Sequence, residues 1–149
     1  MKDNFELVKT IGVISEAVED GGEFTLYPKG FSMLPTIRQN RDYVTLIKAF
    51  GLKKGDIVLY KRKSGEFVLH RILKINKSGI LLCGDNQSAI ESGITENDIL
   101  FLVKSYGNSK AETRRGSLKF WIDWKFARLY QRIKATYHTL KIAFCRNIK

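Results

Sequence analysis

Short apolar runs separated by turn-forming clusters fill residues 23–106, and this alternation most restricts what the chain can fold into. The runs are rich in β-branched and aromatic residues and cover 24–27, 43–49, 57–62, 67–75, 80–83 and 99–106. That composition is typical of strands. The polar, glycine-containing clusters at 63–66 and 76–79 join consecutive runs as hairpin connections do. The pattern therefore predicts a mainly β domain of antiparallel strands.

The segments on either side of this domain have a different pattern of apolar and polar residues. Residues 1–22 show a loosely helical apolar spacing that stops at a Gly-Gly pair, which predicts a short N-terminal helix. Residues 108–116 are polar and flanked by glycine, so we expect a linker closing the β-rich domain of residues 23–107. From 117 to 149, apolar residues recur at intervals of three, four and seven among lysines and arginines, which predicts a basic amphipathic helix.

Length, net charge and hydropathy indicate the size of the domain, its kind of partner and its location. Its 149 residues suit one compact domain with an appendage, and 26 Lys and Arg against 15 Asp and Glu give a net charge of +11. This charge favours an anionic partner, either nucleic acid or phospholipid headgroups. No run of about 18 uncharged apolar residues occurs, and the N-terminal residues lack the layout of a secretory signal. We therefore expect a cytoplasmic or peripheral membrane protein without a transmembrane helix.

Disulfide and metal chemistry are not indicated by the cysteines. Cys83 and Cys145 lie far apart in the sequence and match neither a disulfide framework nor a zinc spacing. We expect two reduced thiols, no metal and no cofactor.

The sharpest local feature is a serine between a glycine and a proline. Ser32 follows Gly30 and precedes Met33 and Pro35, so its backbone cannot continue a helix or a central strand. We expect a turn, shaped by Met33 and Pro35, that presents the Ser32 hydroxyl. Such a serine is commonly only a loop residue, and it becomes a nucleophile when a positioned base removes its proton.

One of the two histidines supplies a candidate base. His70 lies in the apolar run at 67–75, between Val68 and Ile72 on the same strand face. Burial there favours the neutral, proton-accepting imidazole that Ser32 would need. The alternative is a core histidine bonded to a backbone carbonyl.

Two acids are candidates to orient His70. Asp85 stands in a Gly-Asp-Asn tripeptide directly after a predicted strand, where a carboxylate could reach the imidazole. Aspartate in such turns also commonly bonds its own backbone. Glu91, six residues further on, is the second candidate.

Four motifs occur in the order expected of one peptidase superfamily. They are Ser-Met-Leu-Pro-Thr at 32–36, Gly-Asp-Ile-Val at 55–58, Leu-His-Arg-Ile at 69–72 and Gly-Asp-Asn at 84–86. Over residues 23–106 the chain resembles signal peptidase I and the LexA-like serine peptidases. This resemblance implies a signal-peptidase/LexA-like antiparallel β fold.

The resemblance also implies roles for single residues. Ser32 matches the nucleophile, and His70 stands where most bacterial members have a lysine base, so the chain resembles the Ser-His type. In that type the orienting acid lies in or just after the Gly-Asp-Asn turn, at Asp85 or at Glu91, which replaces an aspartate. Gly30 stands where an oxyanion-hole serine often occurs, so backbone N–H groups near Ser32 would carry that stabilisation.

The activity implied is that of a serine endopeptidase cleaving a leader or signal-like peptide through an acyl-enzyme on Ser32. The substrate would be an extended segment with small side chains near the scissile bond. The N-terminal membrane anchor of true signal peptidases is missing, so we expect an anchorless relative. A LexA-like self-cleaving regulator and a non-catalytic peptide-binding module on the same fold are the alternatives.

Three kinds of partner fit the basic helix at 117–145. Its Trp, Tyr, Lys and Arg side chains suit an anionic membrane surface. Its amphipathic pattern suits docking on its own domain or on a second copy equally well. Nucleic acid is less favoured, because no DNA-reading module is recognised. His138 is expected to be only a surface side chain of this helix.

Overall fold

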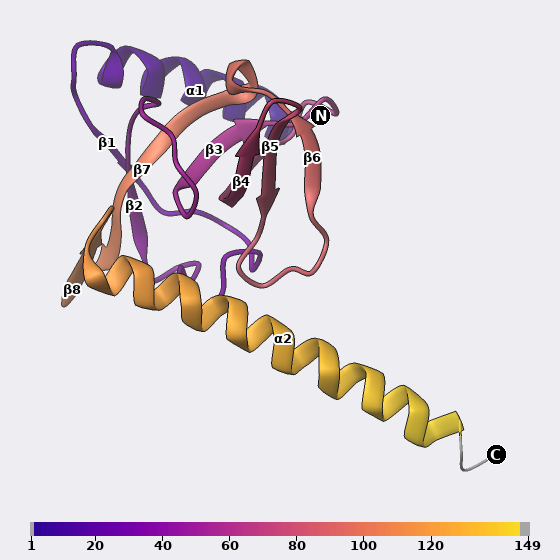
Figure 1. Cartoon of the computed structure of the whole chain (residues 1–149). Coiled ribbons are helices and arrows are strands. Elements are labelled where there is room, and N and C mark those ends of the chain that lie inside the picture. The colour runs from indigo at the N-terminus through magenta and orange to yellow at the C-terminus, as the bar shows by residue number, and fades with distance from the viewer. Residues whose placement is uncertain (1, 147–149) are drawn as a thin grey trace.

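The computed structural model describes the backbone of residues 2–146 and the side chains of 10–133, 136 and 137. The fold is a curved sheet with two helices, one formed by the N-terminal residues and one by the C-terminal residues (Figure 1). In chain order the elements are α1 (Lys2–Glu19), β1 (Phe24–Leu26), β2 (Tyr43–Lys48), β3 (Ile57–Lys61), β4 (Phe67–Asn76), β5 (Gly79–Cys83), β6 (Glu91–Ile94), η1 (Glu96–Asp98), β7 (Ile99–Asn108), β8 (Ala111–Arg114) and α2 (Leu118–Arg146). The side chains of Cys145 and His138 lie outside the described residues.

All strand pairs of the sheet are antiparallel. The strand order is β1-β2-β7-β3-β4-β5-β6, and β8 pairs with β7 off this path. β7 is the seventh strand in sequence, yet it lies between β2 and β3 in the sheet and pairs with both. The prediction of a mainly β, antiparallel domain with a helix at each end is confirmed, and each predicted apolar run coincides with one strand to within two residues.

The sheet has apolar side chains buried on both faces. Side chains of β3 and β7 alternate between two clusters, as the period of two requires. The first cluster contains Ile14, Val18, Met33, Ile37, Val44, Leu46, Ile57, Phe101, Val103, Tyr106 and Phe120. The second contains Val58, Tyr60, Ile72, Ile80, Leu82, Ile94, Ile99 and Leu102. Each buried aliphatic or aromatic side chain contributes roughly 1.5–3 kcal/mol, so the two clusters together fix the sheet.

The predicted linker at 108–116 is wrong, because this segment extends the sheet. β7 continues to Asn108 and turns into β8, with Asn108 opposite Ala111 and Ser105 opposite Arg114. The Asn108 side chain accepts a hydrogen bond of 2.9 Å from the N–H of Lys110, which closes the turn. The polar composition of this segment therefore led to the prediction of a linker where the chain forms a hairpin. The short strand β6 was likewise not predicted.

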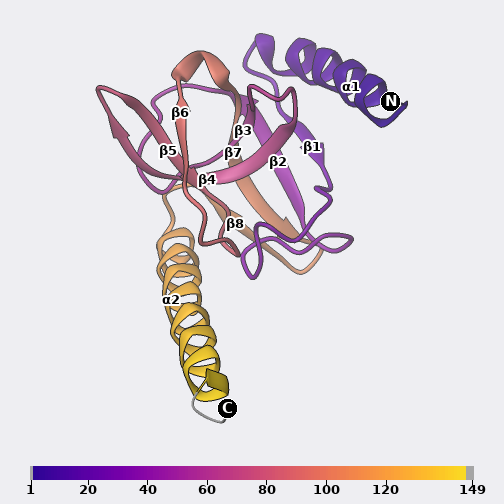
Figure 2. The same ribbon diagram turned by 90° about the vertical axis from the view of Figure 1, so that its right-hand side faces the viewer.

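The two helices lie at opposite ends of the sheet (Figure 2). Ile14 and Val18 bury one face of α1 in the first cluster. Phe120, Trp124 and Ala127 bury the first turns of α2, and its later turns extend beyond the sheet (Figures 1 and 2). In the described part of the chain, neither helix is long and apolar enough to cross a bilayer. The predicted C-terminal helix is present, and residues 147–149 of its expected range lie outside the description.

Candidate active site

The Ser32 loop connects β1 to β2 and is anchored by its neighbours. Met33 and Ile37 are buried in the first cluster, and the N–H of Ile37 donates to the carbonyl of Met33 at 2.9 Å. Gly30 has a φ of +104°, a conformation that glycine adopts without strain, and its N–H donates to Gln39 Oε1 at 2.9 Å. The predicted turn is therefore present, and Ser32 itself is only half-buried on it.

The Gly-Asp-Asn turn after β5 lies against the Ser32 loop. The N–H of Asn86 donates to the carbonyl oxygen of Ser32 at 2.7 Å, and Asn86 Nδ2 donates to the carbonyl of Phe31 at 3.1 Å. A methyl group on Gly84 would lie 2.6 Å from the carbonyl oxygen of Ser32. Only glycine allows the two backbones to approach this closely.

His70 reaches the same turn from β4. It is completely buried, opposite Val58 in the register of β3 and β4. A methyl group on Gly84 would lie 3.1 Å from His70 Nε2, so this nitrogen faces the turn that holds Ser32. Among the described residues, Nε2 has no hydrogen-bond partner. Such an atom is uncommon in a folded protein, and the indole Nε1 of Trp124 is the other buried side-chain atom without a partner among the described residues.

Nδ1, the other ring nitrogen of His70, faces a polar cluster. Glu91 Oε1 lies 3.2 Å from Nδ1 and the Tyr60 hydroxyl lies 3.1 Å from it. Burial lowers the pKa of His70 to about 4, against the attraction of the Glu91 charge. The imidazole is therefore neutral near pH 7, as the sequence predicted. Burial raises the pKa of Tyr60, so its hydroxyl stays protonated.

Arg62 holds the Glu91 carboxylate in place. Arg62 Nε donates to Glu91 Oε2 at 2.9 Å, and Arg62 Nη2 donates to Oε1. These hydrogen bonds lower the pKa of Glu91, which keeps it ionised beside the imidazole. The sequence analysis named Glu91 but neither Arg62 nor Tyr60. Tyr60 lies on β3 beside the β4 strand that carries His70, and Arg62 follows β3 and reaches Glu91 at the start of β6, contacts that a linear pattern does not show.

Asp85, the first acid named from sequence, is bound to other groups. Its carboxylate accepts 2.9 and 2.7 Å hydrogen bonds from Arg71 and a 2.5 Å hydrogen bond from the Thr36 hydroxyl. Arg71 follows His70 in β4, so its side chain points to the opposite face of the strand. The structure therefore gives the contact with His70 to Glu91. Asp85 instead ties β4 to the Ser32 loop.

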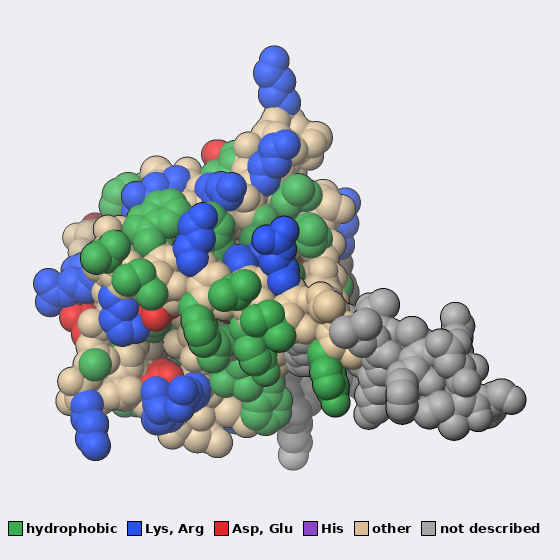
Figure 3. All heavy atoms as spheres, turned by 60° about the horizontal axis from the view of Figure 1, so that its bottom comes forward, with side chains coloured by type: hydrophobic (Ala, Val, Ile, Leu, Met, Phe, Trp, Pro, Cys, Tyr) green, Lys and Arg blue, Asp and Glu red, His purple; other side chains and the backbone are tan. Residues whose placement is uncertain are grey.

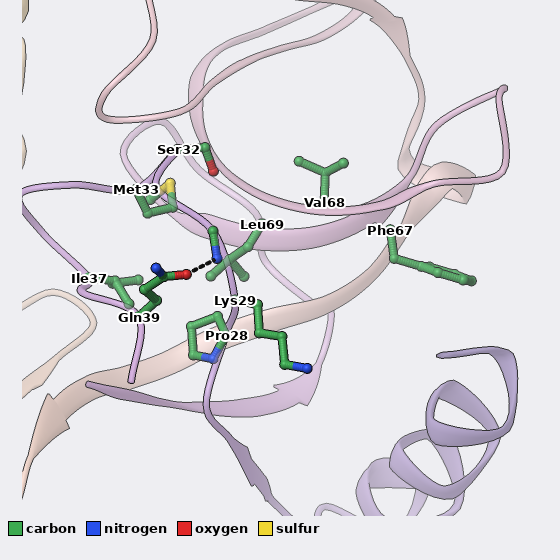
Figure 4. Close-up of a pocket in the computed structure, with 10 residues that line it drawn as sticks. Pro28, Lys29, Ser32, Met33, Ile37, Gln39, Phe67, Val68 and Leu69 are labelled. Carbon is green, nitrogen blue, oxygen red and sulfur yellow. Dashed lines mark hydrogen bonds between the residues drawn. The ribbon is translucent and has the colours of Figure 1, made fainter. Parts of the chain in front are cut away.

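A small cavity of about 110 Å³ opens beside Ser32 (Figure 4). Ser32 and Met33 lie on one side of it, with Val68 and Leu69 of β4 on the other, and Pro28, Lys29, Gly30, Ile37, Gln39 and Phe67 complete the lining. An adjoining apolar groove of about 340 Å³ runs beneath α1 and shares Pro28 and Leu69 with the cavity. A chain segment could therefore extend from Ser32 along this side of the sheet.

The structure brings Ser32, His70 and Glu91 together from three separate segments of the chain. In the described part of the chain, no group of His, Cys, Asp and Glu side chains is arranged to hold a metal ion. The chemistry that these side chains can carry out on their own is base-assisted nucleophilic attack by a hydroxyl. No family model, no curated protein and no solved structure matches this chain.

Proposed function

We propose that the protein is a serine endopeptidase with Ser32 as nucleophile and His70 as general base. The observation that carries this proposal is the buried Nε2 of His70, which lacks a partner among the described residues and faces the turn bonded to Ser32. A structural histidine would use both ring nitrogens, whereas a general base needs one free lone pair. The resemblance of the sequence to signal peptidases points to the same pair.

The reaction would follow from the positions of these groups. Ser32 Oγ attacks the carbonyl carbon of the scissile bond while His70 Nε2 takes the hydroxyl proton. The imidazolium then gives this proton to the leaving amine nitrogen as the C–N bond breaks, which leaves an ester on Ser32. A water molecule, deprotonated by the same nitrogen, then attacks the ester, and the imidazolium returns this proton to Ser32 Oγ as the C–O bond breaks and the new carboxylate leaves. Throughout, His70 Nδ1 donates its hydrogen to Glu91, which stabilises the transient cation.

Backbone groups of the Ser32 loop would stabilise the oxyanion. Gly30 has no side chain to contribute, and its N–H is already bonded to Gln39. The N–H of Ser32 or of a neighbouring residue would therefore face the oxyanion. Such a donor contributes on the order of 3 kcal/mol to the transition state.

An extended peptide fits the free edge of β4. β5 pairs with β4 only from Arg71 onward, whereas β3 pairs with residues 67–71 along the other edge. The edge without a β5 partner, residues 67–69, also lines the Ser32 cavity. A substrate strand could bond to this edge and direct its scissile carbonyl toward Ser32. The small cavity favours a small side chain there, consistent with a leader or signal-like peptide.

Acylation by a fluorophosphonate probe tests the catalytic pair. We expect the wild-type protein to be labelled on Ser32 and the Ser32→Ala variant to be unlabelled. His70→Ala should reduce the labelling rate by about a hundredfold or more, because general base catalysis contributes that much. Ser64→Ala, in the exposed turn between β3 and β4, is the matched control and should label as wild type does.

Two results would contradict the proposal. Labelling that His70→Ala leaves unchanged would remove the histidine from the mechanism. Peptide binding that survives both alanine variants, together with no turnover by the wild type, would indicate a binding module instead.

A further inference from the structure

α2 has an apolar stripe that does not face its own domain. The stripe consists of Leu118, Ile122, Phe126, Leu129, Ile133 and Tyr137, each between 54% and 77% exposed. Their spacing of three and four residues places them on one side of the helix. The side that packs on the sheet contains Phe120, Trp124 and Ala127 instead. We call the exposed set the α2 stripe.

The α2 stripe lies on one face of the whole molecule. When the lower side of Figure 1 is turned forward, hydrophobic side chains gather there beside Lys and Arg (Figure 3). Scattered exposed apolar residues are normal, but a continuous row along about five turns of a helix indicates a surface that binds a partner.

Cations flank the α2 stripe, with almost no opposing charge. Lys119, Lys125 and Arg132 are exposed on the same helix. The single acidic residue of α2 is Asp123, and its carboxylate accepts hydrogen bonds from Tyr106 at 2.7 Å and from Lys119 at 2.5 Å. The charge available to a partner along the stripe is therefore positive.

Exposed aromatic rings complete this surface. Trp121 and Tyr130 lie on α2 and are 39% and 43% exposed. Indole and phenol rings are stabilised at the boundary between acyl chains and headgroups, where one part of the ring is apolar and the other is wet. Aromatic, aliphatic and cationic side chains on one exposed helix are the combination that an anionic lipid surface binds.

We propose that the α2 stripe binds an anionic phospholipid bilayer, with α2 lying parallel to the surface. The apolar side chains enter the boundary below the headgroups, and Lys125 and Arg132 contact lipid phosphates. A second copy of the chain is a poorer occupant. Pairing two such stripes would bring their basic flanks together with only one acid per helix to oppose them.

The bound orientation would bring the Ser32 loop near the lipid. Phe126 of the stripe lines a hollow of about 260 Å³ together with Pro35 and Thr36 of that loop. If the proposed peptidase activity holds, its substrates would be peptides presented at a membrane surface. The lipid binding itself does not depend on catalysis, so Ser32→Ala should bind vesicles as wild type does.

Vesicle co-sedimentation tests the proposal with the full chain. We expect binding to vesicles of equimolar phosphatidylcholine and phosphatidylglycerol, and binding at least about tenfold weaker to phosphatidylcholine alone, because each basic contact adds to affinity. Raising the salt concentration should weaken the binding. Ile122→Ser combined with Phe126→Ser should also reduce it by about tenfold or more, through lost apolar burial.

Matched variants distinguish binding through the α2 stripe from nonspecific adsorption to vesicles. Val13→Ser, on α1 at the other end of the sheet, removes an apolar side chain that is 56% exposed, close to the 54% of Ile122, and should leave binding unchanged. Lys125→Gln should weaken binding, whereas Lys77→Gln in the β4–β5 turn should not. Circular dichroism should show unchanged folding for these three variants and for the Ile122/Phe126 double variant, because the altered side chains are exposed.

Three outcomes would overturn the proposal. The first is a wild-type protein that binds neither kind of vesicle. The second is binding that the Ile122/Phe126 variant retains in full. The third is a dimer in analytical ultracentrifugation that this variant dissociates, which would assign the stripe to a second copy of the chain.

Discussion

At the scale of single residues, the state of His70 depends on how charge is balanced around it. A carboxylate beside a buried imidazole would ordinarily raise the pKa of the ring. Here Arg62 is bonded to that carboxylate of Glu91 and opposes its effect, and burial dominates. His70 therefore remains neutral while one ring nitrogen is held by Glu91. This combination gives an oriented, neutral imidazole rather than a permanent ion pair.

Exchanging the two candidate acids for amides should separate their roles. Glu91→Gln should slow fluorophosphonate labelling by at least about tenfold, because the imidazolium that forms on His70 loses its counter-charge. Its effect on stability should be small, about 1 kcal/mol, since the lost pair with Arg62 is partly exposed. Labelling rates per folded molecule and thermal unfolding provide the two measurements.

Asp85→Asn should show the opposite pattern. It removes the counter-charge of the completely buried Arg71, which costs about 3–5 kcal/mol of unfolding free energy. The rate per folded molecule should change less than in Glu91→Gln. A larger loss of rate in Asp85→Asn, with none in Glu91→Gln, would assign the orienting role to Asp85.

At the scale of elements, α2 is bonded to the turn that carries Asp85. Gln131 Nε2 donates to the carbonyl oxygen of Asp85 at 2.9 Å and approaches Asn86 Oδ1 at 3.4 Å. Asn86 in turn donates to the carbonyl of Ser32. Nearer its start, α2 is held because the preceding Arg115 pairs with the buried Asp56. A surface helix thus supports the candidate active site through consecutive hydrogen bonds.

Removing the amide of Gln131 should disturb the Ser32 loop from a distance. Gln131→Ala leaves the Asp85 carbonyl without this donor, at a cost of about 1 kcal/mol. We expect labelling of Ser32 to slow by roughly fivefold, the equivalent of that energy. Thr136→Ala, which removes only a hydroxyl bonded within α2, should label at the wild-type rate. Equal rates for the two variants would show that α2 and the active site act independently.

At the scale of the whole molecule, His70 connects protonation to folding. Its pKa is about 4 in the folded protein and about 6.5 in an unfolded chain. Between these values the unfolded chain binds the proton and the folded protein does not. Stability therefore falls as pH decreases from about 6.5 to about 4, and above 6.5 this contribution is fully present. Carboxylates with lowered pKa, such as Asp42 and Glu91, lose their contribution at still lower pH.

Thermal unfolding as a function of pH tests this linkage. We expect the wild-type protein to lose up to roughly 3 kcal/mol between pH 6.5 and 4 through this one group. The His70→Gln variant should have a lower stability at neutral pH but a flatter profile in this window. Parallel profiles for the two proteins would show that the buried imidazole does not titrate as described.

Several features of this protein could be predicted from local sequence. The apolar runs identified the strands because β-branched and aromatic residues favour extended backbone, and the turn clusters between them mark where each strand ends. Ser32 and His70 were singled out because a serine on a glycine–proline turn and a histidine within an apolar strand are each unusual locally. The neutral state of His70 followed from its apolar neighbours alone.

The remaining features depend on contacts between distant residues. A polar stretch became β8 because Asn108 and Ala111 could complete an edge of β7, and composition does not encode such pairing. The amphipathic pattern of 117–149 could not show which side of the helix docks, since Phe120 and Trp124 were as apolar as the stripe left exposed. Sequence also could not show that Glu91, rather than Asp85, contacts His70, because Asp85 pairs with Arg71 and Glu91 with Arg62 across the folded sheet. Sequence thus determined the local conformations and the candidate reactive groups, whereas the tertiary structure decided their partners, because hydrogen bonds and ion pairs form between residues that meet only when the sheet has folded.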